Sequence, residues 1–340
     1  MSRTDYPKQF LDILNTGKTL IQSTFDRFAQ FIPLENIYVV TSESYREIVA
    51  TQLPAMNTAN ILCEPSRKNT AACVAYISYK LLKLNPNANL ICAPADHLIT
   101  DEATFIKTCE DALHFTSHIK ALLTLGIKPT NPNTGYGYIQ YETYAVSDNV
   151  YKVKTFTEKP DRELAKTFVA SGDFLWNAGI FVWEVKNIVK AFEKLLPEMH
   201  DVFFAEIESF NTENETAAIE RIYPQCVNIS IDYGIMEKAE NVYVIPSSFG
   251  WSDLGTWASA YDTLEKDYLE NAVAGDNVVV IDATKNMIHA DNKKLVVLQG
   301  LEDFVIVDTK DVLLICKKEK EQDIKQYVAE IKRNKGDKYL

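Results

Sequence analysis

The sequence predicts an α/β protein with a β-sheet core, followed by a small β module. Between residues 18 and 125, short apolar runs with strand character alternate with segments whose apolar residues recur at helical spacing. Such alternation is typical of βαβ units and a parallel sheet. Beyond about residue 268, short β runs recur every eight or nine residues with Asn, Asp and Gly between them. We therefore expect one domain over residues 1–268 and a C-terminal module over residues 269–340.

The alternating region opens with a predicted helix, in which Leu20, Ile21, Phe25 and Phe28 recur at helical spacing. The later segments are predicted in the same way, from apolar residues at helical spacing and from short apolar runs with strand character. Strands are predicted at residues 37–40, 61–63, 90–93 and 121–125, and helices at residues 45–53, 69–84 and 105–115.

The middle of the chain, residues 126–246, predicts a mixed sheet. Residues 138–141 and 150–156 have the pattern of antiparallel additions, and residues 179–183 form another buried strand. Helices are expected at residues 162–169 and after residue 183. In the C-terminal module, strands are predicted at residues 278–281, 287–289, 295–298, 304–307 and 312–315, and a surface helix over residues 317–335.

Composition excludes some classes of partner. The chain has 340 residues, is 46% hydrophobic and carries a formal net charge of -12, which argues against nucleic acid because no basic surface would offset the phosphate backbone. Six cysteines without close pair spacing predict reduced thiols, neither a disulfide framework nor a zinc site. No signal peptide or membrane-spanning run is recognisable, so we expect a cytoplasmic protein without a membrane partner.

Two aspartates stand where a cation site is expected. Asp96 follows the apolar run of residues 89–95, just past a predicted strand, and Asp253 lies in a turn rich in Gly and Trp. Ligands of open α/β sheets bind at the carboxyl ends of the strands, and hard cations prefer carboxylate oxygens. Each aspartate alone is equally well explained as a turn former or helix cap.

Residues 64–71 read Glu-Pro-Ser-Arg-Lys-Asn-Thr-Ala, between a predicted strand and a predicted helix. Asn69 or Thr70 can cap this helix and leave backbone N–H groups facing the sheet edge. The segment is then either an ordinary basic cap or a nucleotide site in which Arg67 and Lys68 flank an anion-binding helix end.

Three further features are compatible with sugar-phosphate binding. Residues 126–138 form a long loop with the run Gly-Tyr-Gly-Tyr, which is either a hairpin connection or a substrate loop. Glu158 and Lys159 end a strand, as a solvated ion pair or as a hydroxyl acceptor beside a phosphate-binding lysine. Asn177 precedes a strand, and Asp232 is either a helix cap or a ligand contact. The sequence shows no arrangement in which a Ser or Cys nucleophile would use His97 as its base.

In their order and wording, these motifs resemble the sugar-nucleotide pyrophosphorylases, and specifically the mannose-1-phosphate guanylyltransferases. The resemblance covers nearly the whole chain. The matching runs are residues 6–11, 64–71, 94–97, 135–139, 156–160, 176–179, 230–233, 250–255 and 307–309.

The resemblance implies a Rossmann-like nucleotidyltransferase domain with a mixed central sheet, and a C-terminal module similar to a left-handed β-helix. It implies transfer of GMP from GTP to mannose 1-phosphate with Mg²⁺ as cofactor. By position, Asp96 and Asp253 would hold the metal and Lys8 would contact phosphate. The residues implied to face the nucleotide are Glu64, Lys68, Asn69, Thr70, Pro94 and Ala95, and those implied to hold the sugar phosphate are Gly137, Tyr138, Glu158, Lys159, Asn177 and Asp232.

The chain departs from the family at its start. Members of the family begin with a strand and a glycine-rich loop that wraps the triphosphate, on the order of twenty residues. Here the first residues correspond to the end of that loop, and we expect Met1 to be an internal methionine of a longer frame.

Two alternatives to the guanylyltransferase therefore stay open. One is a non-catalytic chain that binds sugar phosphate or pairs with a complete subunit, and the other is a pyrophosphorylase for another nucleoside triphosphate or hexose 1-phosphate. For the C-terminal module, an exposed sheet edge or apolar face predicts a homodimer surface.

Overall fold

The computed structural model describes residues 6–290 and 293–339, which form two compact units. The larger unit comprises residues 27–94 and 99–251. The smaller unit comprises the described residues up to Asp26, residues 95–98 and those from Ser252 onward. The expected boundary near residue 268 stays a prediction, because the unit that holds the C-terminal module also includes earlier parts of the chain.

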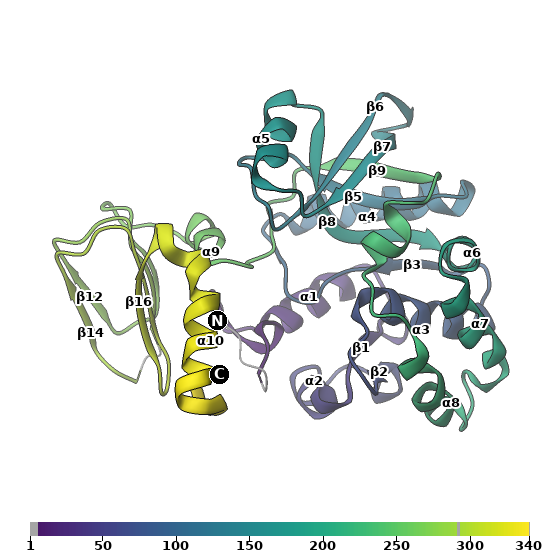
Figure 1. The fold of residues 1–340 in the computed structure, drawn as a ribbon, viewed down its shortest axis with the longest axis horizontal. Helices are drawn as coiled ribbons and strands as arrows, with labels where there is room; N and C mark the ends of the chain where they lie inside the picture. The colour runs from purple at the N-terminus through teal and green to yellow at the C-terminus, as the bar shows by residue number, and fades with distance from the viewer. Residues whose placement is uncertain (1–5, 291–292, 340) are drawn as a thin grey trace. The chain divides into compact units, whose positions relative to one another are not determined.

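The larger unit is built on a six-stranded mixed sheet in the order β3-β8-β5-β9-β7-β6 (Figure 1). β5 and β9 run parallel, whereas β8 is antiparallel to both of its neighbours, β3 and β5. The strands are β3 (Asn89–Cys92), β5 (Leu122–Ile127), β6 (Gly137–Ser147), β7 (Val150–Glu158), β8 (Phe174–Glu184) and β9 (Val242–Ser247).

The structure confirms the mixed sheet and corrects one detail of its pairing. The antiparallel addition of β6 and β7 is as predicted. The alternation up to residue 125 predicts a parallel sheet. Among the described residues of that region, β1 (Val39–Ser42) and β2 (Ile61–Glu64) do pair with each other in parallel, but as a separate two-stranded sheet, and β3 and β5 are not neighbours. The reason is that β8, from the middle of the chain, pairs between β3 and β5.

Helices cover both faces of the six-stranded sheet. Along β8, Phe181 and Trp183 pack in one apolar cluster with α3, α6 and α7, while Ile180 and Val182 pack in another with α4. This alternation is the period of two expected of a strand buried on both faces. The helices of this unit are α2 (Arg46–Gln52), α3 (Asn69–Leu84), α4 (Glu102–His118), α5 (Arg162–Ser171), α6 (Val185–Leu195), α7 (Pro197–Ala205) and α8 (Glu215–Ile222). The residues of α1 (Leu20–Ala29) belong to the smaller unit up to Asp26 and to the larger unit from Arg27.

The ends of α5 show how local sequence sets an element. Asp161 accepts a hydrogen bond from the N–H of Leu164 at 2.9 Å, which caps the amino end. Gly172 ends the helix in the left-handed conformation, at φ 78°, where a side chain would be strained. The helix is thus confined to the segment directly after Lys159.

The smaller unit contains a β-helix, as predicted. Its parallel strands stack at equivalent positions, so that Ala272 pairs with Met287 and Met287 with Val305. The predicted strands are confirmed within two residues. They are β12 (Val278–Ile281), β13 (Met287–Ala290), β14 (Val296–Gln299), β15 (Phe304–Asp308) and β16 (Leu313–Lys317), and they are preceded by β11 (Ala272–Ala274), which was not predicted. The helices of this unit are α9 (Trp257–Thr263) and α10 (Ile324–Lys335), and the short strands β4 (Leu98–Ile99) and β10 (Trp251–Ser252) lie where the chain passes between the units.

Two buried asparagines connect successive turns of this β-helix. Asn271 donates to the backbone oxygen of Ala283, and its own side-chain oxygen accepts the N–H and the side-chain amide of Asn286. Asn286 in turn donates to the backbone oxygen of Leu301 and accepts the N–H of Phe304. Because both side chains are fully hydrogen-bonded although buried, the pair stabilises the turns between strands.

Within the described part of the chain, none of the helices combines the length and the apolar character needed to cross a lipid bilayer.

Candidate active site

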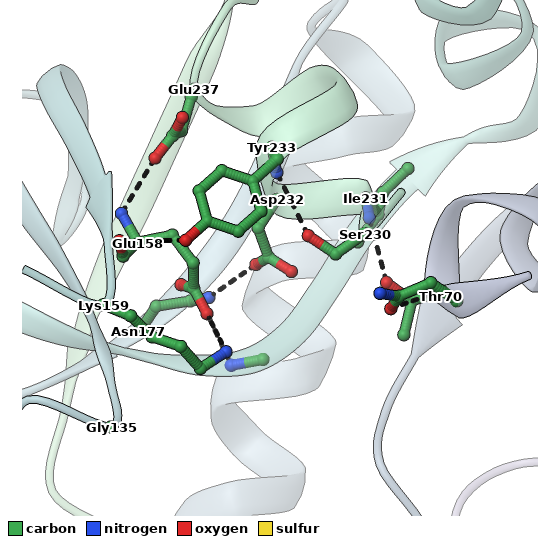
Figure 2. A network of polar contacts seen from close by, with 12 residues as sticks. Thr70, Gly135, Glu158, Lys159, Asn177, Ser230, Ile231, Asp232, Tyr233 and Glu237 are labelled. Carbon is green, nitrogen blue, oxygen red and sulfur yellow. Dashed lines mark hydrogen bonds and ion pairs between the residues drawn. The ribbon is translucent and has the colours of Figure 1, made fainter. Parts of the chain in front are cut away.

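Glu158, Asn177 and Asp232 converge in the larger unit, although they come from distant parts of the sequence (Figure 2). Glu158 is the last residue of β7, Asn177 lies within β8, and Asp232 begins the π-helical turn η7 (Asp232–Met236). The side-chain amide of Asn177 donates to Asp232 Oδ1 at 2.9 Å, and Lys159 Nζ lies 2.6 Å from Glu158 Oε1. The structure thus brings together four of the residues predicted to hold a sugar phosphate.

The second carboxylate oxygen of Glu158 is the most unusual atom of this cluster. The Glu158 side chain is 8% exposed, and its Oε2 has no hydrogen-bond partner among the described residues. A Cβ added at Gly137 would lie 2.3 Å from this oxygen, so only glycine fits opposite it. A buried acceptor of this kind is expected to receive a hydrogen bond from a ligand, such as a sugar hydroxyl.

The charges of the cluster are strongly coupled. Burial, together with the nearby Glu158 carboxylate, raises the pKa of Asp232 to about 6. Desolvation opposes the charge of Lys159, yet its pKa is raised because Glu158 and Asp232 stabilise the ammonium. The larger unit therefore holds two carboxylates and one lysine in close contact, which is a suitable arrangement for a ligand with hydroxyl and phosphate groups.

Asn177 is held in one orientation by hydrogen bonds to its side-chain oxygen. Thr124 Oγ1 donates to Asn177 Oδ1 at 2.9 Å, and the N–H of Gly179 donates to the same atom at 3.1 Å. Since the oxygen accepts these bonds, the amide nitrogen points toward Asp232. The orientation of Asn177 thus follows from β5 and β8 themselves.

Tyr138, which is also predicted to hold the sugar phosphate, makes its contacts within the protein. The ring is fully buried against Phe168, and its hydroxyl donates to the backbone oxygen of Asn133 at 2.9 Å. This bond closes the loop before β6. The sequence did not predict a cluster of three aromatic rings in the same part of the larger unit. Tyr136 packs edge-on against both Trp176 and Trp251, with ring centroids 5.0 and 5.2 Å apart. All three rings lie within the motif runs of the sequence, and this is the signal that could have indicated the cluster.

The predicted nucleotide segment is engaged with other parts of the larger unit. Glu64 Oε1 accepts hydrogen bonds from the Tyr223 hydroxyl and the Cys73 thiol. Lys68 Nζ donates to the backbone oxygen of Pro224 at 2.7 Å.

The expected capping of α3 is wrong in one respect. The helix begins at Asn69, so that Lys68 is the capping residue, and it makes no side-chain cap bond. Asn69 instead accepts the N–H of Thr70, and Thr70 Oγ1 accepts the N–H of Ile231 at 2.9 Å (Figure 2). Thr70 therefore fixes the segment directly before Asp232. Pro94 and Ala95 follow β3 and lead directly into Asp96.

In the smaller unit, Lys8 connects the two predicted metal ligands. Lys8 Nζ lies 3.0 Å from Asp96 Oδ2 and also donates to the backbone oxygen of Asp253. The side chains of Lys8 and Asp96 are 16% and 32% exposed, so both stay accessible in part. Asp96 and Asp253, which are far apart in the sequence, thus both lie within reach of the Lys8 ammonium group.

The chemistry of these groups fits a hard cation. Among the described residues there is no cluster of three or more His, Cys, Asp or Glu side chains that could form a complete protein cage. Mg²⁺ commonly binds through one or two carboxylates plus substrate phosphates, and Asp96 and Asp253 carry carboxylates of this type. Binding of a metal ion by these residues is a proposal.

Comparison with known proteins settles the family. Residues 1–270 match the family model described as nucleotidyl transferase, and residues 276–331 match that of the MannoseP isomerase/GMP-like beta-helix domain. The chain is 36% identical over 335 residues to the alginate biosynthesis protein AlgA of Pseudomonas aeruginosa, covering 97% of this chain and 69% of the relative. It is also 36% identical over 340 residues to the mannose-1-phosphate guanylyltransferase of Salmonella montevideo, covering 98% and 70%. This chain belongs to the mannose-1-phosphate guanylyltransferase family.

A solved structure has the same fold. The crystal structure of a Thermus thermophilus protein described as mannose-1-phosphate geranyltransferase is 28% identical, with a TM-score of 0.87 over 97% of this chain and 94% of that one. The comparisons confirm the predicted family, the enzyme class and the fold class, including the C-terminal β-helix. The chain is accordingly a nucleotidyltransferase of the GDP-mannose pyrophosphorylase type.

Proposed function

We propose that this chain transfers GMP from GTP to mannose 1-phosphate, giving GDP-mannose and pyrophosphate. The observation that carries the proposal is the buried cluster of Glu158, Asn177 and Asp232, with an unsatisfied carboxylate oxygen beside a lysine. In a family whose relatives are named mannose-1-phosphate guanylyltransferase, this cluster is suited to a hexose that carries a phosphate.

Each residue of the cluster has a distinct role in the proposal. Glu158 accepts sugar hydroxyls through its unsatisfied oxygen, Asn177 orients the sugar, and Lys159 holds its phosphate as a point charge. Asp232 stabilises the orientation of Asn177. Thr70 and its neighbours Glu64, Lys68 and Asn69, with Pro94 and Ala95, are proposed to face GTP.

The smaller unit contributes the charge neutralisation that phosphoryl chemistry needs. Attack of a sugar phosphate on the α-phosphorus of GTP needs alignment and compensation of negative charge, with little covalent help from the protein. Asp96 and Asp253 are proposed to hold Mg²⁺, which when bound neutralises phosphate charge. Lys8, whose ammonium already lies between these two residues, contacts a phosphate oxygen.

The direct test is pyrophosphate release by this 340-residue chain with Mg²⁺, mannose 1-phosphate and each of the four nucleoside triphosphates. Release with GTP alone is the expected result. Release with another nucleotide would replace GTP in the proposal. Binding of mannose 1-phosphate by a folded chain without release would instead favour the non-catalytic alternative, because the cluster around Glu158 is complete within the larger unit.

Asp253→Asn tests the metal site. The change removes a charge without a change in volume, so turnover should fall by about a thousandfold while the fold is kept, as several kcal/mol of charge stabilisation are lost. Asp262→Asn, on the exposed part of α9, is the matched control. Near-normal turnover of the Asp253 variant would refute its assignment as a ligand.

We also propose that the C-terminal β-helix forms a homodimer contact. Val279 and Ile281 of β12 and Val297 of β14 are exposed by 43%, 45% and 54%, and such aliphatic groups on one sheet are typical of an interaction surface. Light scattering at micromolar concentration should give the mass of a dimer. A monomer mass would refute this assignment.

A further inference from the structure

The backbone N–H groups at the amino end of α9 donate hydrogen bonds to acceptors from two different parts of the chain. The first N–H groups of any helix lack partners within the helix. Thr256 accepts the N–H of Ser259 at 3.0 Å, and Ser259 Oγ accepts the N–H of Thr256 at 3.1 Å, which forms a capping box. The N–H groups of Trp257 and Ala258, which this box does not reach, donate to the two carboxylate oxygens of Glu321.

Glu321 comes from the far end of the chain. It lies in η8 (Lys318–Asp323), which follows the last strand of the β-helix, 64 residues beyond Trp257. Burial raises the pKa of Glu321, while the two backbone N–H groups act in the opposite direction. A carboxylate at this position also interacts favourably with the positive end of the helix dipole.

The start of α9 determines where Asp253 lies. A single tight turn joins the two, in which Asp253 Oδ1 accepts the N–H of Gly255 at 2.9 Å. Leu254, within that turn, has a positive φ of 46°, which is strained for a leucine. Its side chain is fully buried in a cluster that includes Trp257 and Ile324. The turn is therefore held on its carboxyl side, by the first turn of α9 with Glu321 and by the packing of Leu254 against this cluster.

We infer that Glu321 is a positioning residue for Asp253, so that the segment after the β-helix forms part of the catalytic architecture. The inference rests on the proposed role of Asp253 in metal binding. Glu321 itself touches neither metal nor substrate. It fixes the first turn of α9 through two hydrogen bonds, and α9 fixes the strained turn that presents the Asp253 carboxylate.

The test measures metal binding without turnover, using Mn²⁺ as the probe and electron paramagnetic resonance as the readout. Glu321→Ala is expected to weaken Mn²⁺ binding about tenfold, because two charge-assisted hydrogen bonds are lost. Glu321→Gln keeps one acceptor oxygen and should weaken binding less, and it replaces the alanine variant should that variant not fold. Glu319→Gln, an exposed residue of the same short helix, is the matched control and should bind Mn²⁺ normally.

A double-mutant cycle separates positioning from general stability. In a chain that already carries Asp253→Asn, Glu321→Gln should cause no further loss of Mn²⁺ affinity. Independent and additive losses would overturn the inference, as would a lower Tm with unchanged Mn²⁺ affinity, or a wild-type chain that does not bind Mn²⁺. If the wild-type chain releases no pyrophosphate but the cycle gives the expected coupling, the proposed function fails and the positioning role stands.

Discussion

Two polar clusters of this molecule both contain buried asparagines, and they differ in charge and in hydrogen-bond satisfaction. In the β-helix, Asn271 and Asn286 have partners for the donor and acceptor groups of both amides. In the larger unit, Asn177 is likewise well paired, but Glu158 retains a buried oxygen without a partner among the described residues, and Asp232 has a raised pKa. Asn271, Asn286 and Asn177 are all buried and the Glu158 side chain is only 8% exposed, yet hydrogen-bond satisfaction differs between the two places.

This difference is the one expected between a structural cluster and the proposed ligand site. A fully paired network rigidifies a core, and any loss of a partner is costly there. A network with an unpaired oxygen and crowded charges is less stable than it could be, which is common where a ligand completes the pairing. The two clusters should therefore respond in opposite ways to substitution.

Asn286→Ala should give the largest effect, and the effect should be on stability. The change leaves the N–H of Phe304 and the oxygen of Leu301 without their partner, at a cost of about 3 kcal/mol in the free energy of unfolding. Calorimetric Tm values compared with those of Asn214→Ala, an exposed asparagine, provide the measurement. Equal Tm values for both variants would show that the asparagine pair is not structural.

Glu158→Gln should instead lower activity without a loss of stability. It removes the charge that a sugar hydroxyl would bind, so kcat/KM for mannose 1-phosphate should fall about a hundredfold, as expected for a hydrogen bond to a charged group. Because Glu158 is not fully paired in the protein alone, the Tm should be unchanged or higher. Glu163→Gln, on the exposed side of α5, is the control. A large loss of Tm with normal kinetics would place Glu158 among the structural residues.

Sequence predicted much of the fold because local patterns carry it. The strands of the β-helix follow from short β runs at regular spacing, and α3 has the predicted bounds of residues 69–84. The pairing of β8 between β3 and β5 was missed, because a period of two does not say which strand lies beside which. Partner choice is a long-range property.

The candidate site shows the same limit. The family resemblance named Glu158, Asn177 and Asp232, but not the hydrogen bond that joins the last two. Glu321 escaped notice altogether, since a single glutamate in a charged tail has the same local pattern as a solvated one. Only the fold shows that its carboxylate reaches the amino end of α9.

Lys159→Met sharpens the comparison within the larger unit. The variant keeps the length of the side chain and removes the ammonium group, so the KM for mannose 1-phosphate should rise about tenfold, as for one lost charge-assisted contact. The KM for GTP should stay the same. Lys166→Met, which breaks an exposed ion pair on α5, is the control. An effect confined to GTP would contradict the assignment of Lys159 to the sugar phosphate.

The smallest expected effect concerns Asp232 and pH. Its folded-state pKa of about 6 lies above the usual aspartate value, so the folded protein binds this proton more tightly than the unfolded chain does. The ionised carboxylate therefore destabilises the fold near pH 7, and this penalty decreases as the pH falls through 6. From pH 7 to pH 5, the wild-type chain should gain about 1 kcal/mol in the free energy of unfolding relative to Asp232→Asn.

Urea denaturation at both pH values measures this difference. Burial raises the pKa of Asp232 most, and the side chains that also act on it are Glu158, Lys159 and Asn177, all of which Asp232→Asn leaves in place. Parallel stabilities of the two proteins from pH 7 to pH 5 would show that Asp232 titrates normally. In that case the cluster would lack the charge crowding that distinguishes it from the asparagine pair of the β-helix, and the case for a ligand site would rest on the unpaired oxygen of Glu158.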